Sequence, residues 1–521
     1  MSVVDGHGRR GLVLPARGAQ THGEHERTET HRDCRGRVLP GHRGRRDPGV
    51  ARRGRPHGAA RRFVMMLRND IAPTSGDKVA PVASAPRRSH LGGVVAGSLA
   101  AGFVAAVALP FLPAGTVDTN FSTAMVLLGF ALGWALIAVL SLRFTDQPQR
   151  WAVVPAIFMV VSGMLVLLAP DTVVDALGWV WPLALLALVV WVWTHARREL
   201  HSRTRVWLLN PVLVILMLLA LGGGYETISR STDPTVTMRG QLVDIGPYRL
   251  HLECTGSVGP TVILEPGGGG SAASMGLIAP SVARDSRVCV YDRAGRGWSD
   301  PASSPPDGAQ IATDLHELLA RAHVPGPYVL AGHSFGGLYV RAFAARYPEE
   351  IAGLVLVDST GAKNTPVSPQ KASSYSVLKH LSSLAATTSR LGVGRLIAGT
   401  GFSELPPTYR DDARTTAATG KEMSGFLDEF GVANRSEAQA GELRSLGAKP
   451  LIVLTAELDN SKGWMATQNQ TVTLSTNSLH RVVSGATHAS FVESPDHAAA
   501  VTQAIHDVVA SVRTGEPLNG P

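Results

Sequence analysis

The chain has 521 residues, with 49 Lys and Arg against 41 Asp and Glu, and its length exceeds that of one ordinary domain. From residue 238 onward, acidic residues outnumber basic ones by 26 to 23, so the net charge of +8 arises upstream. A nucleic-acid-binding protein normally carries basic residues on its folded domain, so we expect no nucleic-acid partner. The three cysteines form no cluster with metal-site spacing, and we expect neither a metal nor an organic cofactor.

Residues 1–88 are rich in Arg, Gly, His and Pro and show no apolar periodicity. Such a segment buries too little apolar surface to offset its chain entropy, so we predict that it is disordered. Two interpretations fit. The segment is a polybasic arm lying on anionic lipid, or part of it is not translated, because Met65 and Met66 stand just ahead of the first apolar run.

Five apolar stretches follow, and a helix of about 20 such residues crosses the roughly 30 Å of bilayer hydrocarbon. Apart from Asp175 they carry no ionisable residue near their centres, whereas transport pathways usually need such groups there. We therefore interpret region 89–225 as a bundle of membrane helices that serves as an anchor. The expected spans are about 91–113, 122–142, 151–169, 174–194 and 206–224.

Basic residues in the loops predict the orientation of the spans. They precede the first span and lie between the second and third and between the fourth and fifth spans, whereas the other two loops have none. By the positive-inside rule, the N-terminus is cytoplasmic. Five crossings of the plasma membrane then place a linker at 226–240, and everything after it, on the outer side.

From residue 241 to about 515, short β-like runs alternate with amphipathic segments. This pattern is typical of a mostly parallel sheet with crossover helices, here with eight strands. We expect the strands at 241–246, 248–253, 261–264, 287–291, 328–331, 353–357, 450–454 and 480–484.

The candidate nucleophile is Ser334, at the centre of the motif Gly332-His-Ser-Phe-Gly336. A bare Gly-x-Ser-x-Gly occurs by chance, but here an apolar strand precedes it and a helix-like segment follows it. That context is the one a nucleophile elbow requires, because the glycines permit a sharp turn that exposes the serine hydroxyl.

A glycine run supplies a candidate oxyanion hole. Strand 261–264 continues into Glu265-Pro266 and then into four glycines at 267–270. Without side chains, such backbone allows an N–H group to approach a substrate oxygen. We assign the oxyanion hole to the N–H groups of Gly268 and Phe335. A phosphate-binding loop is disfavoured, because no Gly-Lys-Ser/Thr follows.

The acid and base of a catalytic triad follow the last two strands. Asp459 comes after the seventh strand and His488 after the eighth, which yields the chain order Ser, Asp, His expected for an elbow serine. Glu457 and Asp358 compete with Asp459 as the acid. We favour Asp459.

Together these residues resemble the α/β-hydrolase superfamily, in its esterase, lipase and peptidase-like group with a single lid. The resemblance covers about 240–515 and rests on the motif around Ser334, on Tyr-Asp-Arg-Ala-Gly-Arg-Gly-Trp-Ser-Asp at 291–300 and on Gly-Ala-Thr-His at 485–488. The chain departs from it at Glu265-Pro266, where many members have His-Gly. We expect segment 291–300 to be a structural turn tied by Arg296 and Asp300.

The long connection at about 360–445 contains helix-like stretches and is expected to form a lid over Ser334. The resemblance implies hydrolysis of an ester-type bond in a small-molecule or lipid-like acyl substrate, through an acyl-enzyme on Ser334. An aminopeptidase or acyltransferase with the same triad is the near alternative. A non-catalytic membrane protein that binds a ligand is the distant one.

Cys254 comes at the end of the expected strand 248–253, and Cys289 lies within 287–291. The resemblance implies that these are the second and fourth strands, which are neighbours in the sheet. Facing cysteines on adjacent strands come close enough for a disulfide, which an oxidising outer compartment would preserve. Two buried free thiols are the alternative, because a shift of one residue turns the side chains to opposite faces.

Overall fold

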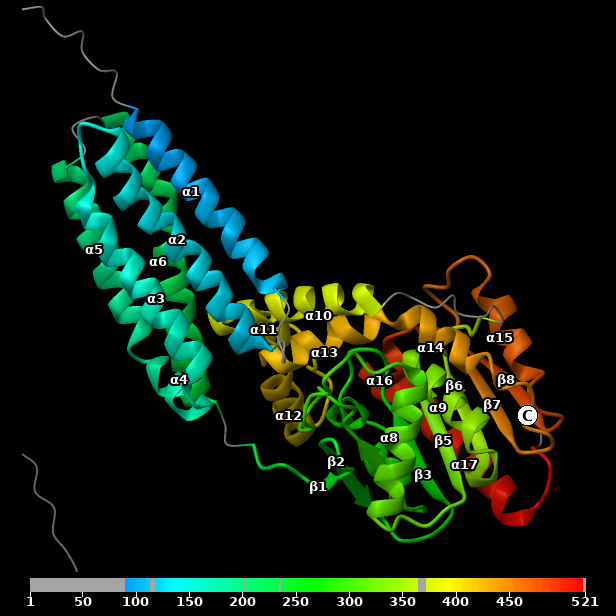
Figure 1. Cartoon of the computed structure of the whole chain (residues 1–521). Helices are drawn as coiled ribbons and strands as arrows, with labels where there is room; N and C mark the ends of the chain where they lie inside the picture. The colour runs from blue at the N-terminus through cyan, green and yellow to red at the C-terminus, as the bar shows by residue number, and fades with distance from the viewer. Residues whose placement is uncertain (1–89, 113–117, 200–202, 234–235, 364–371, 519–521) are drawn as a thin grey trace, which may run out of the picture. The chain divides into compact units, whose positions relative to one another are not determined.

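A computed structural model describes residues 90–112, 118–199, 203–233, 236–363 and 372–518 (Figure 1). The predicted disordered segment 1–88 lies outside the described residues. Within them, a group of apolar helices is followed by a domain with one eight-stranded sheet.

The apolar helices pack closely because small residues line their contacts. A Cβ atom on Gly102 would lie 2.7 Å from the Cα of Gly133, and one on Gly129 would lie 2.2 Å from the backbone nitrogen of Ala106. Close backbone approach at small residues is the usual way in which membrane helices associate. The helices are α1 (Leu91–Ala108), α2 (Thr119–Phe144), α3 (Val153–Leu168), α4 (Asp171–Leu177), α5 (Trp181–Glu199) and α6 (Arg203–Thr232).

Four helices among the described residues are long and apolar enough to cross a membrane, namely Leu91–Phe111, Thr119–Phe144, Arg150–Leu168 and Leu209–Thr232. They match the first, second, third and fifth predicted spans. The fourth predicted span, 174–194, is divided between α4 and α5 and is not among the four. Its longer part, α5, has Arg197 and Arg198 in its last turn, which shortens its apolar portion.

The eight predicted strands are all present, and their order in the sheet is β1-β2-β4-β3-β5-β6-β7-β8. The β1–β2 and β2–β4 pairs are antiparallel and the other pairs are parallel, which confirms the mostly parallel sheet. The strands are β1 (Gln241–Asp244), β2 (Arg249–Thr255), β3 (Thr261–Glu265), β4 (Val288–Tyr291), β5 (Tyr328–His333), β6 (Ile351–Val357), β7 (Leu451–Ala456) and β8 (Ser478–Val483).

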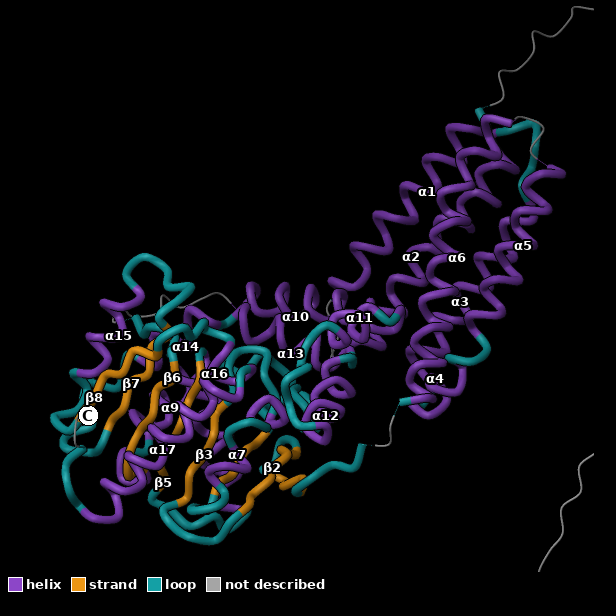
Figure 2. The backbone as a smooth tube through the Cα atoms, turned by 180° about the vertical axis from the view of Figure 1, so that it is seen from behind, coloured by secondary structure: helices purple, strands orange, loops and turns teal. Residues whose placement is uncertain are grey.

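Helices cover both faces of the sheet, as Figures 1 and 2 show from opposite sides. Alternate strand residues enter two apolar clusters: Ile263 packs with side chains of α8 and α9, whereas Val262 and Leu264 pack with those of α7 and α17. Burial on both faces explains why the central strands are continuous apolar runs. The helices of this domain outside the lid are α7 (Ala279–Val282), α8 (Gly308–Arg321), α9 (Phe335–Arg346), α15 (Trp464–Val472), α16 (Ser490–Glu493) and α17 (Pro495–Thr514).

The predicted lid is helical where it is described. Five α-helices lie between β6 and β7, within the expected range 360–445: α10 (Ala372–Ala386), α11 (Val393–Gly399), α12 (Pro407–Ala417), α13 (Gly420–Gly431) and α14 (Ala433–Ala440). Helix α13 brings Phe426 and Phe430 to the glycine run after β3, where a Cβ on Gly269 would lie 2.5 Å from the ring of Phe426.

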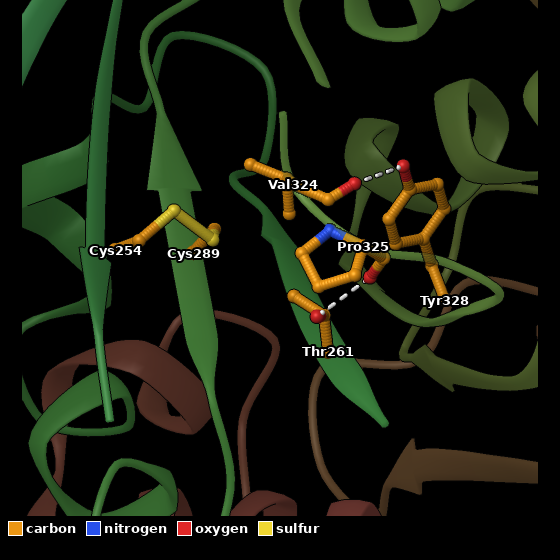
Figure 3. The surroundings of a disulfide bond; sticks show 6 residues. All are labelled: Cys254, Thr261, Cys289, Val324, Pro325 and Tyr328. Atoms are coloured by element: carbon orange, nitrogen blue, oxygen red, sulfur yellow. Dashed lines mark hydrogen bonds between the residues drawn. A yellow bond between two sulfur atoms is a disulfide. The ribbon is translucent and has the colours of Figure 1, made fainter. Parts of the chain in front are cut away.

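Cys254 and Cys289 form a disulfide that joins β2 to β4 (Figure 3). The two residues are direct partners in the antiparallel ladder, and their Cα atoms lie 4.1 Å apart. Of the two alternatives left open by the sequence, the register selects the disulfide over two free thiols.

Candidate active site

Ser334 occupies the turn between β5 and α9 with a φ of 55°, in the left-handed region that few residues other than glycine adopt. The glycines on either side permit this turn. A Cβ on Gly332 would lie 2.5 Å from the carbonyl oxygen of Gly336, and one on Gly336 would lie 2.3 Å from that of Glu265. The motif thus places the serine where the sequence predicts, between a strand and a helix.

The serine hydroxyl is hydrogen-bonded to the predicted base. His488 Nε2 lies 2.8 Å from Ser334 Oγ, and His488 Nδ1 lies 2.6 Å from Asp358 Oδ2. A histidine that donates from Nδ1 to a carboxylate presents Nε2 as a proton acceptor to the hydroxyl. The structure therefore brings together Ser334, His488 and Asp358 in the geometry of a triad.

The carboxylate of Asp358 is buried and rigidly held. Its Oδ1 atom accepts hydrogen bonds from the backbone N–H of Ala456 at 3.1 Å and from the indole N–H of Trp464 at 2.8 Å. Burial opposes its ionisation, but the hydrogen bonds from His488, Trp464 and Ala456 hold the pKa of Asp358 below its usual value. The group is thus an anion aimed at His488.

The prediction of Asp459 as the acid disagrees with this geometry. Asp459 is exposed in the turn after β7, and no hydrogen bond joins it to His488 in the described part of the chain. The competing Glu457 is also exposed, and it accepts hydrogen bonds from Ser484 Oγ and the Gly485 N–H instead. The start of the His488 loop contacts the turn after β7, but the imidazole itself is directed to the end of β6, which makes Asp358 its partner.

The two amides predicted for the oxyanion hole lie beside the serine. Phe335 follows Ser334 at the start of α9, and a Cβ on Gly268 would lie 2.9 Å from the Phe335 ring. Among the described residues, neither N–H donates a hydrogen bond to another protein group. Both are therefore available to an incoming oxygen, next to Ser334 and at a helix N-terminus.

The surroundings of the triad are largely apolar. The Phe335 and Phe430 ring centroids lie 4.9 Å apart and those of Phe426 and Phe430 lie 4.6 Å apart. Beneath the base, His333 Nε2 lies 3.0 Å from the backbone oxygen of His488. Burial, reinforced by nearby His488, lowers the pKa of His333 to about 4. His333 is therefore neutral near pH 7 and supports the loop that carries His488 without adding charge.

Segment 291–300 is a structural turn, as expected, although its ties differ from those predicted. Asp292 accepts hydrogen bonds from His251 and from the backbone N–H groups of Ala272 and Trp298. Of the two expected ties, Asp300 pairs with Arg249, and Arg296 pairs with Glu422 of the lid.

Sequence reasoning missed three buried charged residues behind the glycine run. Arg293 forms ion pairs of 2.7 Å with both Glu265 and Glu429. Glu265, which stands where many α/β hydrolases have His, was a signal that the contacts of this loop differ from those in such proteins. The role of Glu429 could not be read from the sequence, because 164 residues separate it from Glu265.

Comparison with known proteins agrees with the fold of this domain. Residues 260–495 match the family model described as the alpha/beta hydrolase fold. An uncharacterised protein of Schizosaccharomyces pombe is 31% identical over 239 residues, which are 40% of this chain and 43% of that protein. An uncharacterised vacuolar membrane protein of Saccharomyces cerevisiae is 30% identical over 130 residues, or 22% of this chain and 20% of that protein. The chain thus matches less than half the length of these relatives.

Among solved structures, the enol-lactonase of Burkholderia xenovorans aligns with 52% of this chain and 100% of its own, at 18% identity and a TM-score of 0.39. The match of residues 260–495 to the family model confirms the predicted family, and the order and direction of the strands confirm the predicted fold. Residues 260–495 therefore form a domain of the alpha/beta hydrolase fold.

Proposed function

We propose that this chain is a membrane-anchored serine hydrolase that cleaves an ester-type bond through an acyl-enzyme. The observation that carries the proposal is the continuous hydrogen-bonded series from Ser334 through His488 to Asp358. A binding protein has no need of a serine in a strained elbow joined to a buried histidine–aspartate pair.

In the proposed mechanism, His488 Nε2 takes the Ser334 proton as the hydroxyl oxygen attacks the substrate carbonyl. The charge that develops on the carbonyl oxygen is stabilised by the N–H groups of Gly268 and Phe335. His488 then protonates the leaving alcohol. A water molecule, activated by the same nitrogen, releases the acyl group and restores the serine. Asp358 keeps the histidine in the tautomer that both steps require.

The apolar side chains next to the nucleophile favour an apolar acyl or alcohol group. Phe335 lies directly after Ser334, and the ring of lid residue Phe430 lies beside it. The ring of Phe426 lies beside that of Phe430, and both lid residues are exposed. Aromatic rings supply large apolar contact areas for a hydrocarbon portion of a substrate. A lipid-like or other hydrophobic ester therefore suits the site better than a highly charged one.

A fluorophosphonate probe tests the proposed nucleophile. We expect one covalent adduct per chain, on the peptide that contains Ser334, and no adduct in the Ser334→Ala variant, because only an activated serine attacks the phosphorus. A panel of carboxylic esters and aminoacyl amides of matched acyl groups then identifies the bond that is cleaved. Unchanged labelling of Ser334→Ala would reject the assignment, and preference for the amides would favour a peptidase.

The proposed location of the hydrolase domain is the outer side of the plasma membrane. The basic loops support this orientation, provided that α5 crosses the membrane together with the four longer helices. A short apolar helix can cross where the bilayer thins around it. The Cys254–Cys289 disulfide also supports an oxidising compartment.

Protease added to intact cells tests this orientation. We expect it to digest the domain beyond residue 233 while a cytoplasmic marker stays whole, because an outer domain is accessible without lysis. Protection of the domain in intact cells, together with digestion in inverted vesicles, would place it in the cytoplasm and show that α5 does not cross.

A further inference from the structure

Arg293 uses its guanidinium group to hold the backbone of the proposed oxyanion loop. The side chain is 1% exposed, and its Nη1 and Nη2 atoms donate to the carbonyl oxygens of Pro266 at 2.9 Å and Gly267 at 2.8 Å. The same group pairs with Glu265, just before the loop, and with Glu429 of lid helix α13. From the turn after β4, Arg293 thus bridges the glycine loop and the lid.

The hydrogen bond to Gly267 bears directly on the oxyanion hole. The carbonyl of Gly267 and the N–H of Gly268 belong to one planar peptide unit, in which they point in opposite directions. Because the Gly267 oxygen points to Arg293 Nη2, the Gly268 N–H faces away from the arginine. The orientation of this donor therefore depends on Arg293.

The next two peptide units are held by Glu429 of the lid and by Arg296, which the lid in turn binds. The N–H of Gly269 donates to Glu429 Oε2 at 2.8 Å, and the carbonyl of Gly269 accepts from Arg296, which pairs with Glu422 of the same lid helix at 2.7 Å. Gly269 has a φ of +77°, so no side chain stiffens the turn at this point. The peptide units on both sides of Gly268 are thus fixed by buried charged groups, of which Glu429 contacts both Gly269 and Arg293.

A need for stability alone does not explain this arrangement. Burying an arginine between two carboxylates costs desolvation energy that its ion pairs only partly offset, and apolar residues of similar volume would often be as stable. Burial raises the pKa of Glu265 to about 7, against the effect of Arg293. For Glu429 the two arginines outweigh burial and lower its pKa. Glu429 is therefore a lasting negative charge opposite Arg293.

We propose that Arg293 and Glu429 are positioning residues of the oxyanion hole, and that the hole is complete only while lid helix α13 is seated on the glycine loop. The lid then acts in catalysis as well as in covering the site. This inference rests on the proposed serine-hydrolase function and assigns the geometry of its oxyanion donor to a contact between lid and loop.

Glu429→Gln tests the proposal with little change in shape. Its oxygen can still accept from Gly269, but its NH₂ group must face the Nε donor of Arg293, so that contact becomes repulsive. Loss of a whole oxyanion donor lowers kcat by about 10²–10³, and a displaced donor should lower it by roughly 10- to 100-fold. We expect this loss in kcat for a short p-nitrophenyl ester, with KM nearly unchanged.

Asp428→Asn is the matched control. Asp428 is the adjacent buried carboxylate of α13, but it pairs with Lys379 and Ser382 inside the lid and does not contact the glycine loop. We expect it to lower the melting temperature without a matching loss of kcat. An alkyl boronic acid supplies a second readout, because its tetrahedral adduct on serine places an oxygen in the oxyanion hole. Its affinity should fall in Glu429→Gln by a factor similar to that in kcat.

The outcomes separate the inference from the proposed function. Equal kcat losses in Glu429→Gln and Asp428→Asn would overturn the inference, and so would an unchanged boronate affinity in Glu429→Gln. Either result would show that the contact between Glu429 and Arg293 contributes only to packing. Should Glu429→Gln fail to fold, Glu422→Gln, which loosens the hold of Arg296 on Gly269, must show the same selective loss of kcat. Failure of the proposed function would appear earlier, as probe labelling that does not depend on Ser334.

Discussion

Asp358→Asn is expected to lower kcat by about 10⁴-fold, the loss that the same change causes in a serine-protease triad. The asparagine oxygen can still accept from Ala456 and Trp464, so the residue should keep its place. Its NH₂ group then faces His488 Nδ1, which must become the acceptor. The histidine proton moves to Nε2, and that nitrogen can no longer take the proton of Ser334. Hydrolysis of a chromogenic ester by the purified variant measures the effect.

Two further variants show whether the loss belongs to Asp358. Asp459→Asn removes the exposed carboxylate that the sequence favoured, and Glu457→Gln removes its exposed neighbour. Neither side chain is hydrogen-bonded to His488, so both variants should keep most of the parent kcat. If Asp459→Asn costs more activity than Asp358→Asn, the triad acid is Asp459 and the arrangement at the end of β6 is not the active one. Equal melting temperatures would exclude misfolding as the cause.

Removal of the Cys254–Cys289 disulfide is expected to destabilise the hydrolase domain by about 3 to 4 kcal/mol. The bond closes a loop with a sequence separation of 35 residues, and the chain-entropy model assigns a stabilisation of that size to such a loop. Cys289 is fully buried, so alanine is a better replacement there than serine, which would bury an unpaired hydroxyl. Denaturation of the double alanine variant in detergent, compared with the parent with and without reductant, measures the difference.

The same bond reports on the compartment. Cys254 is exposed, so a membrane-impermeant maleimide should label intact cells at this position only after reduction, when the thiol becomes free. The control is the double alanine variant, which should stay unlabelled at these positions. Two reactive thiols from this pair in denatured, unreduced protein would show that the bond is absent in the cell and would remove one support for an outer location.

Features that depend on residues close together in the sequence could be predicted from the sequence itself. The apolar stretches predict four of the long helices. The eight strand-like runs all form strands, because each is a short run, either continuously apolar or alternating apolar and polar, bounded by turn residues. Ser334 was identifiable because the close approaches at Gly332 and Gly336 demand glycine within two residues of it. His488 was identifiable because it follows the last strand, and the resemblance to α/β hydrolases expects the base there.

Features that depend on contacts between distant segments were decided by the tertiary structure. Asp358 and Asp459 both follow parallel strands and reach the same edge of the sheet, so only the direction in which the His488 loop folds selects Asp358. Likewise, the register of β2 against β4 decides whether the two cysteines face each other. Packing of α13 against the glycine loop brings Glu429 to Arg293 across more than a hundred residues. Local patterns specify strands and turns, but such pairings depend on how the elements pack together in three dimensions.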